Sequence, residues 1–184
     1  RSYSFIHNGM VNTDQIFQLI TSADDTWLTT YPPTDYDGEY VDSEIYFLWI
    51  LLNIHQQNGN ILQALKSALT PIRNSNNNAT MNFVLSDGMD LYAYRNCGTS
   101  DTYHPLAYFY HKFQPYKNYY YTGVMTISPV LLDTDYITHQ MEINELVFLS
   151  STGNIVRLPD FVSPSNYYTQ KLGYHAGVNW AGFP

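Results

Sequence analysis

The sequence predicts a single α+β domain, because its pattern of apolar residues changes once along the 184 residues. Up to about residue 70, apolar side chains recur every three or four positions, which is the period of an amphipathic helix. From Met81 onward they form short runs between turn dipeptides such as Asp87-Gly88, which is typical of antiparallel strands. Helices followed by strands, with no linker between them, favour one α+β domain over residues 1–184.

Helical spacing marks three segments before residue 72. Asn12 stands where an N-cap belongs, just before the first apolar repeat. The second segment begins near Asp42 and is apolar on most sides, so we expect it to be buried. The third is predicted to end at Pro71, because proline breaks a helix interior. The predicted helices are residues 13–21, 43–57 and 60–70, and residues 22–41 are predicted to be a loop.

Strand patterns fill the second half of the chain. One hairpin is predicted around Asp87-Gly88, between a run that begins at Met81 and a run that ends at Arg95. Another is predicted around the turn residues 151–154. Residues 160–184 have little periodicity, and we expect an extended tail there. The other predicted strands are residues 105–112, 119–128, 144–150 and 154–158.

Composition and charge exclude several classes of protein. Hydrophobic residues make up 45% of the chain, which excludes disorder over most of its length. The longest apolar run lies between Ile45 and Ile54 and is too short to span a membrane. Eight scattered Lys and Arg stand against sixteen Asp and Glu, so we expect no nucleic-acid partner. One cysteine excludes an internal disulfide and a cysteine-rich metal site, and we expect no metal and no cofactor.

Three short stretches hold the residues of chemical interest. They are Phe5-Ile6-His7-Asn8-Gly9, Val41-Asp42-Ser43-Glu44 and the hairpin of residues 81–95. Asn8-Gly9 is either a tight turn or a pair of N–H donors for a carbonyl oxygen that becomes negative during amide hydrolysis. Asp42 is either an N-cap or a carboxylate oriented to bind an ammonium group. Ser43 and Glu44 are expected to be structural, and the residues alone leave both pairs of alternatives open.

In this order and spacing, the three stretches resemble the class II glutamine amidotransferase domains, which are N-terminal-nucleophile (Ntn) hydrolases. The resemblance covers about residues 3–160 and is closest to the small stand-alone members. It extends to Thr126-Ile127-Ser128-Pro129, Leu146-Val147-Phe148-Leu149 and Gly153-Asn154-Ile155. It implies a partial αββα sandwich, with antiparallel sheets inside and helices outside, of which this chain is the C-terminal portion.

The resemblance also implies a reaction and a set of site residues. The reaction is the cleavage of a γ-glutamyl amide, glutamine above all, by a hydrolase (glutaminase) that in many relatives is joined to a transferase. Asn8 and Gly9 match the oxyanion hole of the family. Asp42 matches the aspartate that holds the α-amino group of glutamine, and His7 is assigned to substrate binding with it.

The chain departs from the family at the nucleophile. The family uses a cysteine at its mature N-terminus, whereas this chain begins with Arg1 and has only Cys97, which follows the hairpin. Nothing matches the arginine that binds the substrate carboxylate in the family. We therefore expect both groups in a missing N-terminal segment or a separate N-terminal chain, and we expect these 184 residues to be inactive alone. Whether the chain is a cleavage product, a shortened form or a degenerate homologue stays open, as does a homo-oligomer.

A non-catalytic binding or structural module on the same fold is the competing hypothesis. Lysine is scarce, whereas tyrosine, asparagine, serine and threonine are abundant, a composition common in secreted and surface proteins. The family resemblance favours a cytoplasmic location, and the composition favours a secreted or surface location. A cysteine encoded upstream of Arg1 would favour the enzyme.

Overall fold

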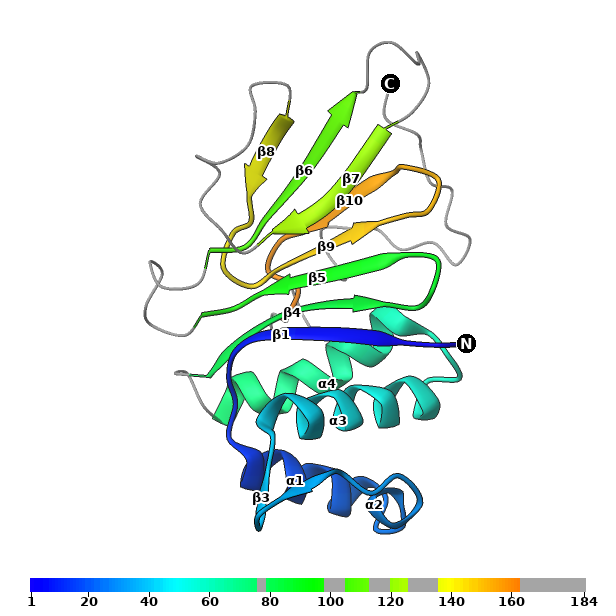
Figure 1. Cartoon of the computed structure of the whole chain (residues 1–184), viewed down its shortest axis with the longest axis vertical. Coiled ribbons are helices and arrows are strands. Elements are labelled where there is room, and N and C mark those ends of the chain that lie inside the picture. The colour runs from blue at the N-terminus through cyan, green and yellow to red at the C-terminus, as the bar shows by residue number, and fades with distance from the viewer. Residues whose placement is uncertain (76–78, 98–104, 113–119, 126–135, 163–184) are drawn as a thin grey trace.

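The structure is a computed structural model that describes residues 1–75, 79–97, 105–112, 120–125 and 136–162. Its helices and strands lie in layers (Figure 1). In chain order the elements are β1 (Ser4–Met10), α1 (Thr13–Ala23), α2 (Trp27–Thr30), β2 (Asp35–Tyr36), β3 (Glu39–Tyr40), α3 (Asp42–Gln56), α4 (Ile61–Ser75), β4 (Thr80–Ser86), β5 (Leu91–Arg95), β6 (Ala107–Lys112), β7 (Tyr120–Met125), β8 (Tyr136–Gln140), β9 (Glu145–Leu149) and β10 (Ile155–Leu158).

A five-stranded antiparallel sheet forms the middle of the molecule, in the order β1-β4-β5-β9-β10. The predicted hairpin joins β4 to β5, and Gly88 takes the positive φ of +87° that its turn requires. The Asp87 carboxylate accepts hydrogen bonds from the main-chain N–H of Met89 and Asp90 across this turn. Among the strands that the structure describes, β1 pairs only with β4 and lies at the edge of the sheet.

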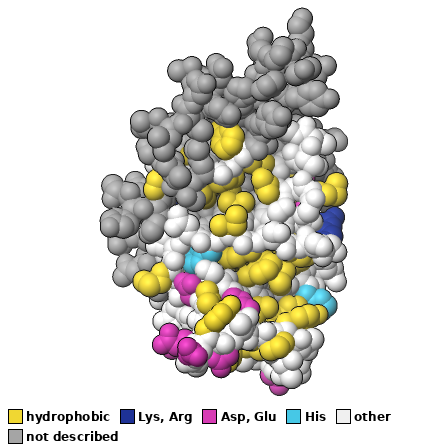
Figure 2. Space-filling model, viewed as in Figure 1, with side chains coloured by type: hydrophobic (Ala, Val, Ile, Leu, Met, Phe, Trp, Pro, Cys, Tyr) yellow, Lys and Arg dark blue, Asp and Glu magenta, His cyan; other side chains and the backbone are white. Residues whose placement is uncertain are grey.

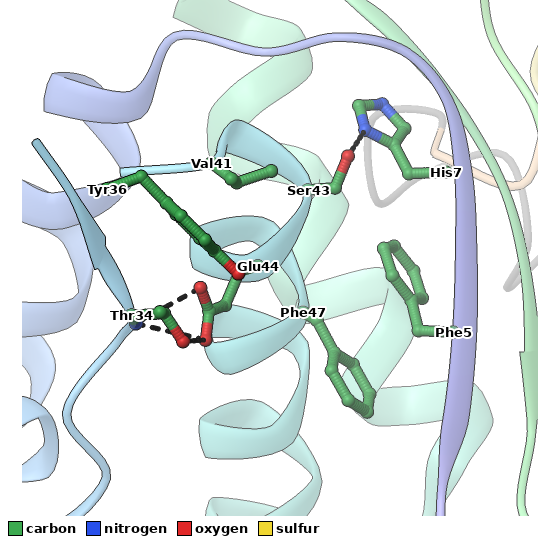
Figure 3. A pocket seen from close by; sticks show the side chains of 8 residues that line it. All are labelled: Phe5, His7, Thr34, Tyr36, Val41, Ser43, Glu44 and Phe47. Carbon is green, nitrogen blue, oxygen red and sulfur yellow. Dashed lines mark hydrogen bonds between the residues drawn. The ribbon is translucent and has the colours of Figure 1, made fainter. Parts of the chain in front are cut away.

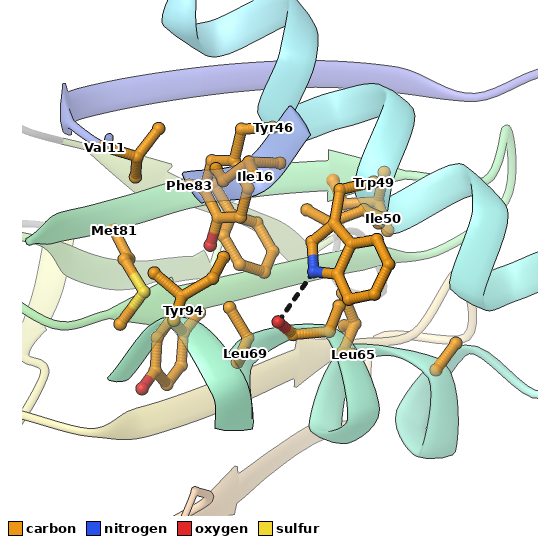
Figure 4. Packing of buried hydrophobic residues seen from close by; sticks show 14 of the residues in the cluster. Val11, Ile16, Tyr46, Trp49, Ile50, Leu65, Leu69, Met81, Phe83 and Tyr94 are labelled. Atoms are coloured by element: carbon orange, nitrogen blue, oxygen red, sulfur yellow. Dashed lines mark hydrogen bonds between the residues drawn. The ribbon is translucent and has the colours of Figure 1, made fainter. Parts of the chain in front are cut away.

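Two long helices cover one face of this sheet. α3 and α4 bury their apolar side chains against alternate residues of β4, β5 and β9, such as Phe83, Tyr94 and Leu146. Trp49 of α3 also donates its indole N–H to the carbonyl of Ala68 in α4 at 2.8 Å (Figure 4). α1 packs on the outer side of α3 (Figure 1). The predicted helix pair on one sheet face is confirmed.

A second sheet lies against the opposite face. β7, β6 and β8 form a three-stranded antiparallel sheet. Tyr108 and Val124 of this sheet pack with Ala93, Val147 and Leu149 of the first. These residues alternate with those that face the helices, as the period of a strand requires. The chain is therefore an α+β sandwich of helices, sheet and sheet, as the sequence predicted.

Three local predictions need correction. α4 continues through Pro71 to Ser75, because Pro71 falls near the helix end, where few main-chain bonds follow it. Ile72 is fully buried there, and Arg73 donates to the carbonyl of Val162 at 2.5 Å. The predicted loop 22–41 contains α2 and the β2–β3 hairpin. β8 was missed.

The start of the predicted tail packs against the core. Phe161 and Val162 are buried in the cluster beneath α3 and α4, and residues 163–184 lie outside the described part of the chain. The predicted N-cap of α1 is confirmed, since Asn12 accepts from the Gln15 N–H at 2.9 Å. Across the described residues, no helix combines the length and apolarity that a membrane span needs.

Candidate functional site

His7 and Asn8 lie on opposite faces of β1. The His7 ring faces α3, with its centre 5.3 Å from that of Tyr46. Since side chains alternate along a strand, Asn8 points to the other face together with Ile6 and Met10. Ile6 is 68% exposed and Met10 is 73% exposed, so this face of β1 is open among the described residues. Within the described part of the chain, no residue forms a hydrogen bond with the side-chain amide of Asn8.

Asn8-Gly9 is not a tight turn, because both residues belong to β1 and pair with Asn82 and Met81 of β4. The Met81 N–H donates to the carbonyl of Asn96 at 2.7 Å, on the β5 side. Neighbouring residues of an antiparallel ladder face alternate sides. Gly9 lies opposite Met81, and this register therefore turns the Gly9 N–H away from β4, toward the edge of β1 on which the described part of the chain places no strand.

Gly9 also makes room for the main chain of β4. A Cβ on Gly9 would overlap the carbonyl oxygen of Thr80 and lie 2.7 Å from its carbon. The same oxygen is 3.0 Å from Nε2 of His7. The absent side chain of Gly9 thus lets the Thr80 carbonyl reach His7.

Asp42 is the first residue of α3 and not its N-cap. The cap residue is Val41, and it makes no side-chain cap bond. Asp42 instead accepts a hydrogen bond from the Val11 N–H through Oδ2, at 3.2 Å. The N-cap alternative is therefore wrong, and the half-buried carboxylate fastens the start of α3 to the residue that follows β1.

Ser43 connects His7 to Asp42. Its Oγ lies 2.9 Å from Nδ1 of His7 and 3.2 Å from Oδ1 of Asp42. Figure 3 shows the His7 ring directed at Ser43 from β1. Ser43 was expected to be structural, since its place between Asp42 and Glu44 at a helix start is the only signal that it carries in the sequence.

A pocket of about 330 Å³ lies on the helix side of β1 (Figure 3). Of the four predicted site residues, His7 lines this pocket, whereas Asn8, Gly9 and Asp42 do not. Glu44 closes one wall by accepting hydrogen bonds from the Thr34 N–H and hydroxyl, each at 3.1 Å. The lining residues are Phe5, His7, Thr34, Tyr36, Val41, Ser43, Glu44 and Phe47.

Acidic side chains gather near this end of the molecule. Asp35, Asp37 and Glu39 of the β2–β3 hairpin are exposed. Figure 2 shows acidic side chains beside hydrophobic ones at the end of the molecule that holds β2 and β3. Within the described segments, no three His, Cys, Asp or Glu side chains are placed to hold a metal ion.

Cys97 and Arg1 are of the residue types that the resemblance assigns to the nucleophile and to the carboxylate-binding group. Cys97 is a free thiol that is only 3% exposed. Arg1 donates to Asp87 at 2.9 Å, at the end of β1 opposite Gly9. Cys97 forms an isolated bridge with Thr80, so β4 lies between it and β1.

Solved structures share this fold. The chain is similar to a glutamine aminotransferase class-II domain protein from Silicibacter pomeroyi, with a TM-score of 0.53, 18% identity, and coverage of 86% of this chain and 68% of that one. It is similar to a predicted glutamine amidotransferase from Pseudomonas aeruginosa, with a TM-score of 0.53, 17% identity, and coverage of 84% and 59%. It is similar to the glutamine phosphoribosylpyrophosphate amidotransferase of B. subtilis, with a TM-score of 0.52, 14% identity, and coverage of 85% and 29%.

These likenesses define the class of protein by its fold, which is that of the glutamine amidotransferase sandwiches. No curated protein sequence matches the chain. The family model described as glutamine amidotransferases class-II matches residues 1–120. The chain belongs to this family, and it spans 59% and 29% of the second and third structures named above.

Proposed function

We propose that this chain carries the oxyanion-stabilising and ammonium-binding side of a glutamine site, in an enzyme that hydrolyses the γ-glutamyl amide and releases ammonia. Membership of the class II family supports this proposal. The observation that carries it is the bond from the Val11 N–H to Asp42. That bond holds a carboxylate just past the strand residues Asn8 and Gly9, although α1 and the β2–β3 hairpin separate the two in sequence.

The proposed chemistry needs two N–H donors at the amide oxygen. A nucleophile that attacks the γ-carbonyl makes its oxygen negative, and donors fixed around that oxygen lower the barrier. Asn8 contributes its amide from the open face of β1, and Gly9 contributes its main-chain N–H from the free edge. Departure of the protonated amine as ammonia then leaves an acyl intermediate for water to hydrolyse.

The same proposal assigns substrate orientation to Asp42. Its carboxylate binds the ammonium group of the substrate, with His7 behind it. A fully extended glutamine separates its two ends by roughly 6 Å, so the binding atoms of Asn8 and Asp42 are expected about 8–12 Å apart. No cofactor takes part.

The nucleophile and the carboxylate-binding arginine are expected outside these 184 residues. The burial of Cys97 supports this, because a nucleophile has to reach its substrate. A separate N-terminal chain or a second copy of the protein are the two sources that we consider. A cytoplasmic location follows from the family, and a secreted or surface location would suit a non-catalytic module.

The test measures ammonia release from glutamine by the protein expressed from its complete gene. We expect turnover, and we expect Asn8→Ala to lower it by about 100- to 1000-fold, as the loss of one oxyanion donor does. The matched control is Asn154→Ala, in the β9–β10 turn, which should leave turnover unchanged. If the complete protein releases no ammonia, or if the two variants behave alike, the proposal is wrong and the non-catalytic module is favoured.

A further inference from the structure

The pocket between β1 and α3 is separate from the groups that would hold the two ends of glutamine. Asn8, Gly9 and Asp42 do not line it. Since side chains alternate along a strand, Asn8 projects from the opposite face of β1. The pocket volume of about 330 Å³ lies at the lower end of the range for small-molecule sites. A ligand bound there would therefore be small, and it would be a second ligand of the protein.

Aromatic rings form much of the wall of this pocket. Phe5 of β1 and Phe47 of α3 are stacked, with an angle of 4° between their planes and 5.1 Å between their centres. Tyr36 of β2 is 59% exposed, and Figure 3 shows it directed across the pocket toward α3. The face of an aromatic ring carries negative potential, which attracts a cation within about 6 Å of the ring centre. These rings therefore favour a ligand with a positive charge.

Glu44 adds a carboxylate to the same wall. Both of its oxygens accept from the Thr34 N–H at 3.1 Å, and Oε1 also accepts from the Thr34 hydroxyl at 3.1 Å. A glutamate ionises well below pH 7, and its two oxygens can accept about four hydrogen bonds. Oε2 therefore keeps an acceptor position for a donor in the pocket. The N-terminus of α3 opposes a cation with roughly half a positive charge, which the full charge of Glu44 outweighs.

The other described groups of the pocket are compatible with a positive ligand. Of the described lining residues, none is a lysine or an arginine. Nε2 of His7 lies 3.0 Å from the Thr80 carbonyl and Nδ1 lies 2.9 Å from Ser43 Oγ, and a neutral imidazole satisfies both contacts. The exposed carboxylates of the neighbouring β2–β3 hairpin add to the negative potential.

We infer that this pocket binds a small organic ammonium ion, whose alkyl part contacts the aromatic rings and whose N–H groups donate to Glu44. An anion would be repelled by Glu44, and a neutral apolar ligand would leave Oε2 without a donor. A hard metal ion takes six or more oxygen ligands, far more than one carboxylate supplies. A free amine and the lysine side chain of another protein share the ammonium chemistry.

The test measures the binding of n-butylammonium chloride to the 184-residue chain, by the shifts of the Thr34 and Ser43 amide signals in ¹⁵N NMR spectra. 1-Butanol and sodium butyrate are the matched neutral and negative probes. We expect saturable binding of butylammonium alone, and we expect added salt to weaken it. The inference is overturned if butylammonium gives no saturable shift, or if butanol binds as tightly.

Two variants locate the charge that attracts the ligand. Glu44→Gln keeps the shape of the side chain and should weaken butylammonium binding by about tenfold, as the loss of a hydrogen bond to a charged group does. Glu39→Gln is the matched control, since it removes the same charge from an exposed residue of β3 that does not line the pocket. If both variants weaken binding equally, butylammonium is attracted to the acidic surface in general and the inference is wrong.

Phe47→Leu tests the aromatic wall without touching the contact between Glu44 and Thr34. It keeps an apolar side chain and should weaken butylammonium binding by about two- to fivefold through the loss of one ring face. Binding of butanol, if any is measured, should not fall with it. Unchanged butylammonium binding in this variant contradicts the role assigned to the rings.

A further probe separates the two sources of the ammonium group. Nα-acetyl-lysine amide presents the same butylammonium group on a blocked main chain. Tighter binding than that of butylammonium assigns the pocket to a lysine of a partner protein, and weaker binding assigns it to a free amine. The inference does not depend on the proposed glutamine site. Failure of ammonia release leaves it standing, and failure to bind butylammonium leaves the proposed function standing.

Discussion

Replacing Gly9 with alanine tests the close approach of β1 and β4. The added methyl group would overlap the Thr80 carbonyl oxygen, which is main chain and cannot rotate away. Overpacking of this kind costs about 1–3 kcal/mol. Moving the carbonyl also breaks its hydrogen bond with His7, worth about 1 kcal/mol. The expected loss in the free energy of unfolding is therefore about 2–4 kcal/mol, or about 5–15 °C in Tm for a chain of this length.

Gly153→Ala is the matched control for this measurement. Gly153 has a φ of +86° but nothing within 4 Å of an added Cβ, so it reports backbone strain alone, about 1 kcal/mol. Both substitutions restrict the unfolded chain equally, and this contribution cancels between them. Urea unfolding followed by circular dichroism gives the two free energies. The reasoning is refuted if Gly9→Ala is no less stable than Gly153→Ala.

Three further outcomes are expected. In the complete enzyme, Asp42→Asn should raise KM for glutamine by about tenfold or more with little change in kcat, whereas Asp25→Asn, an exposed carboxylate on the loop before α2, should change neither. The 184-residue chain alone should release ammonia from glutamine only at background rate. If it did turn over glutamine and Cys97→Ala abolished that activity, the expectation that Cys97 is not the nucleophile would be wrong. Burial, reinforced by Asp87 and Asp90, raises the pKa of Tyr92 to about 12. The neutral phenol therefore stabilises the fold below pH 10, and this stability is lost as pH rises toward 12. In a series of urea midpoints measured against pH, Tyr92→Phe should remove that part of the loss of stability at alkaline pH.

The fold was predictable from the sequence where the local signal agreed with the tertiary packing. The apolar faces of α3 and α4 and the Asp87-Gly88 turn are such signals, and each element formed as expected. The prediction that α4 ends at Pro71 was wrong because a proline costs little stability near a helix end. Buried Ile72 and the hydrogen bond from Arg73 to Val162 compensate for that cost. The β2–β3 hairpin is only two residues per strand, too short for a period to appear.

The site was predictable only in part. The resemblance singled out Asn8, Gly9 and Asp42, but the sequence gives no information on hydrogen bonds between distant segments. The bond between Ser43 and His7 joins α3 to β1, and the bond from the Val11 N–H to Asp42 joins α3 to the residue that follows β1. Such bonds depend on where β1 meets α3 in space, which the local pattern around either residue does not encode.

The edge position of β1 has a consequence for the order of folding. β4 and β5 are joined by a tight turn and close at small entropic cost, whereas the pairing of β1 with β4 closes a loop that contains α1, α3 and α4 and costs more entropy. Long-range pairings of this kind form late and open early. We therefore expect the amides of β1 to exchange with solvent faster than those of β5, and the strand that carries His7, Asn8 and Gly9 to dock last.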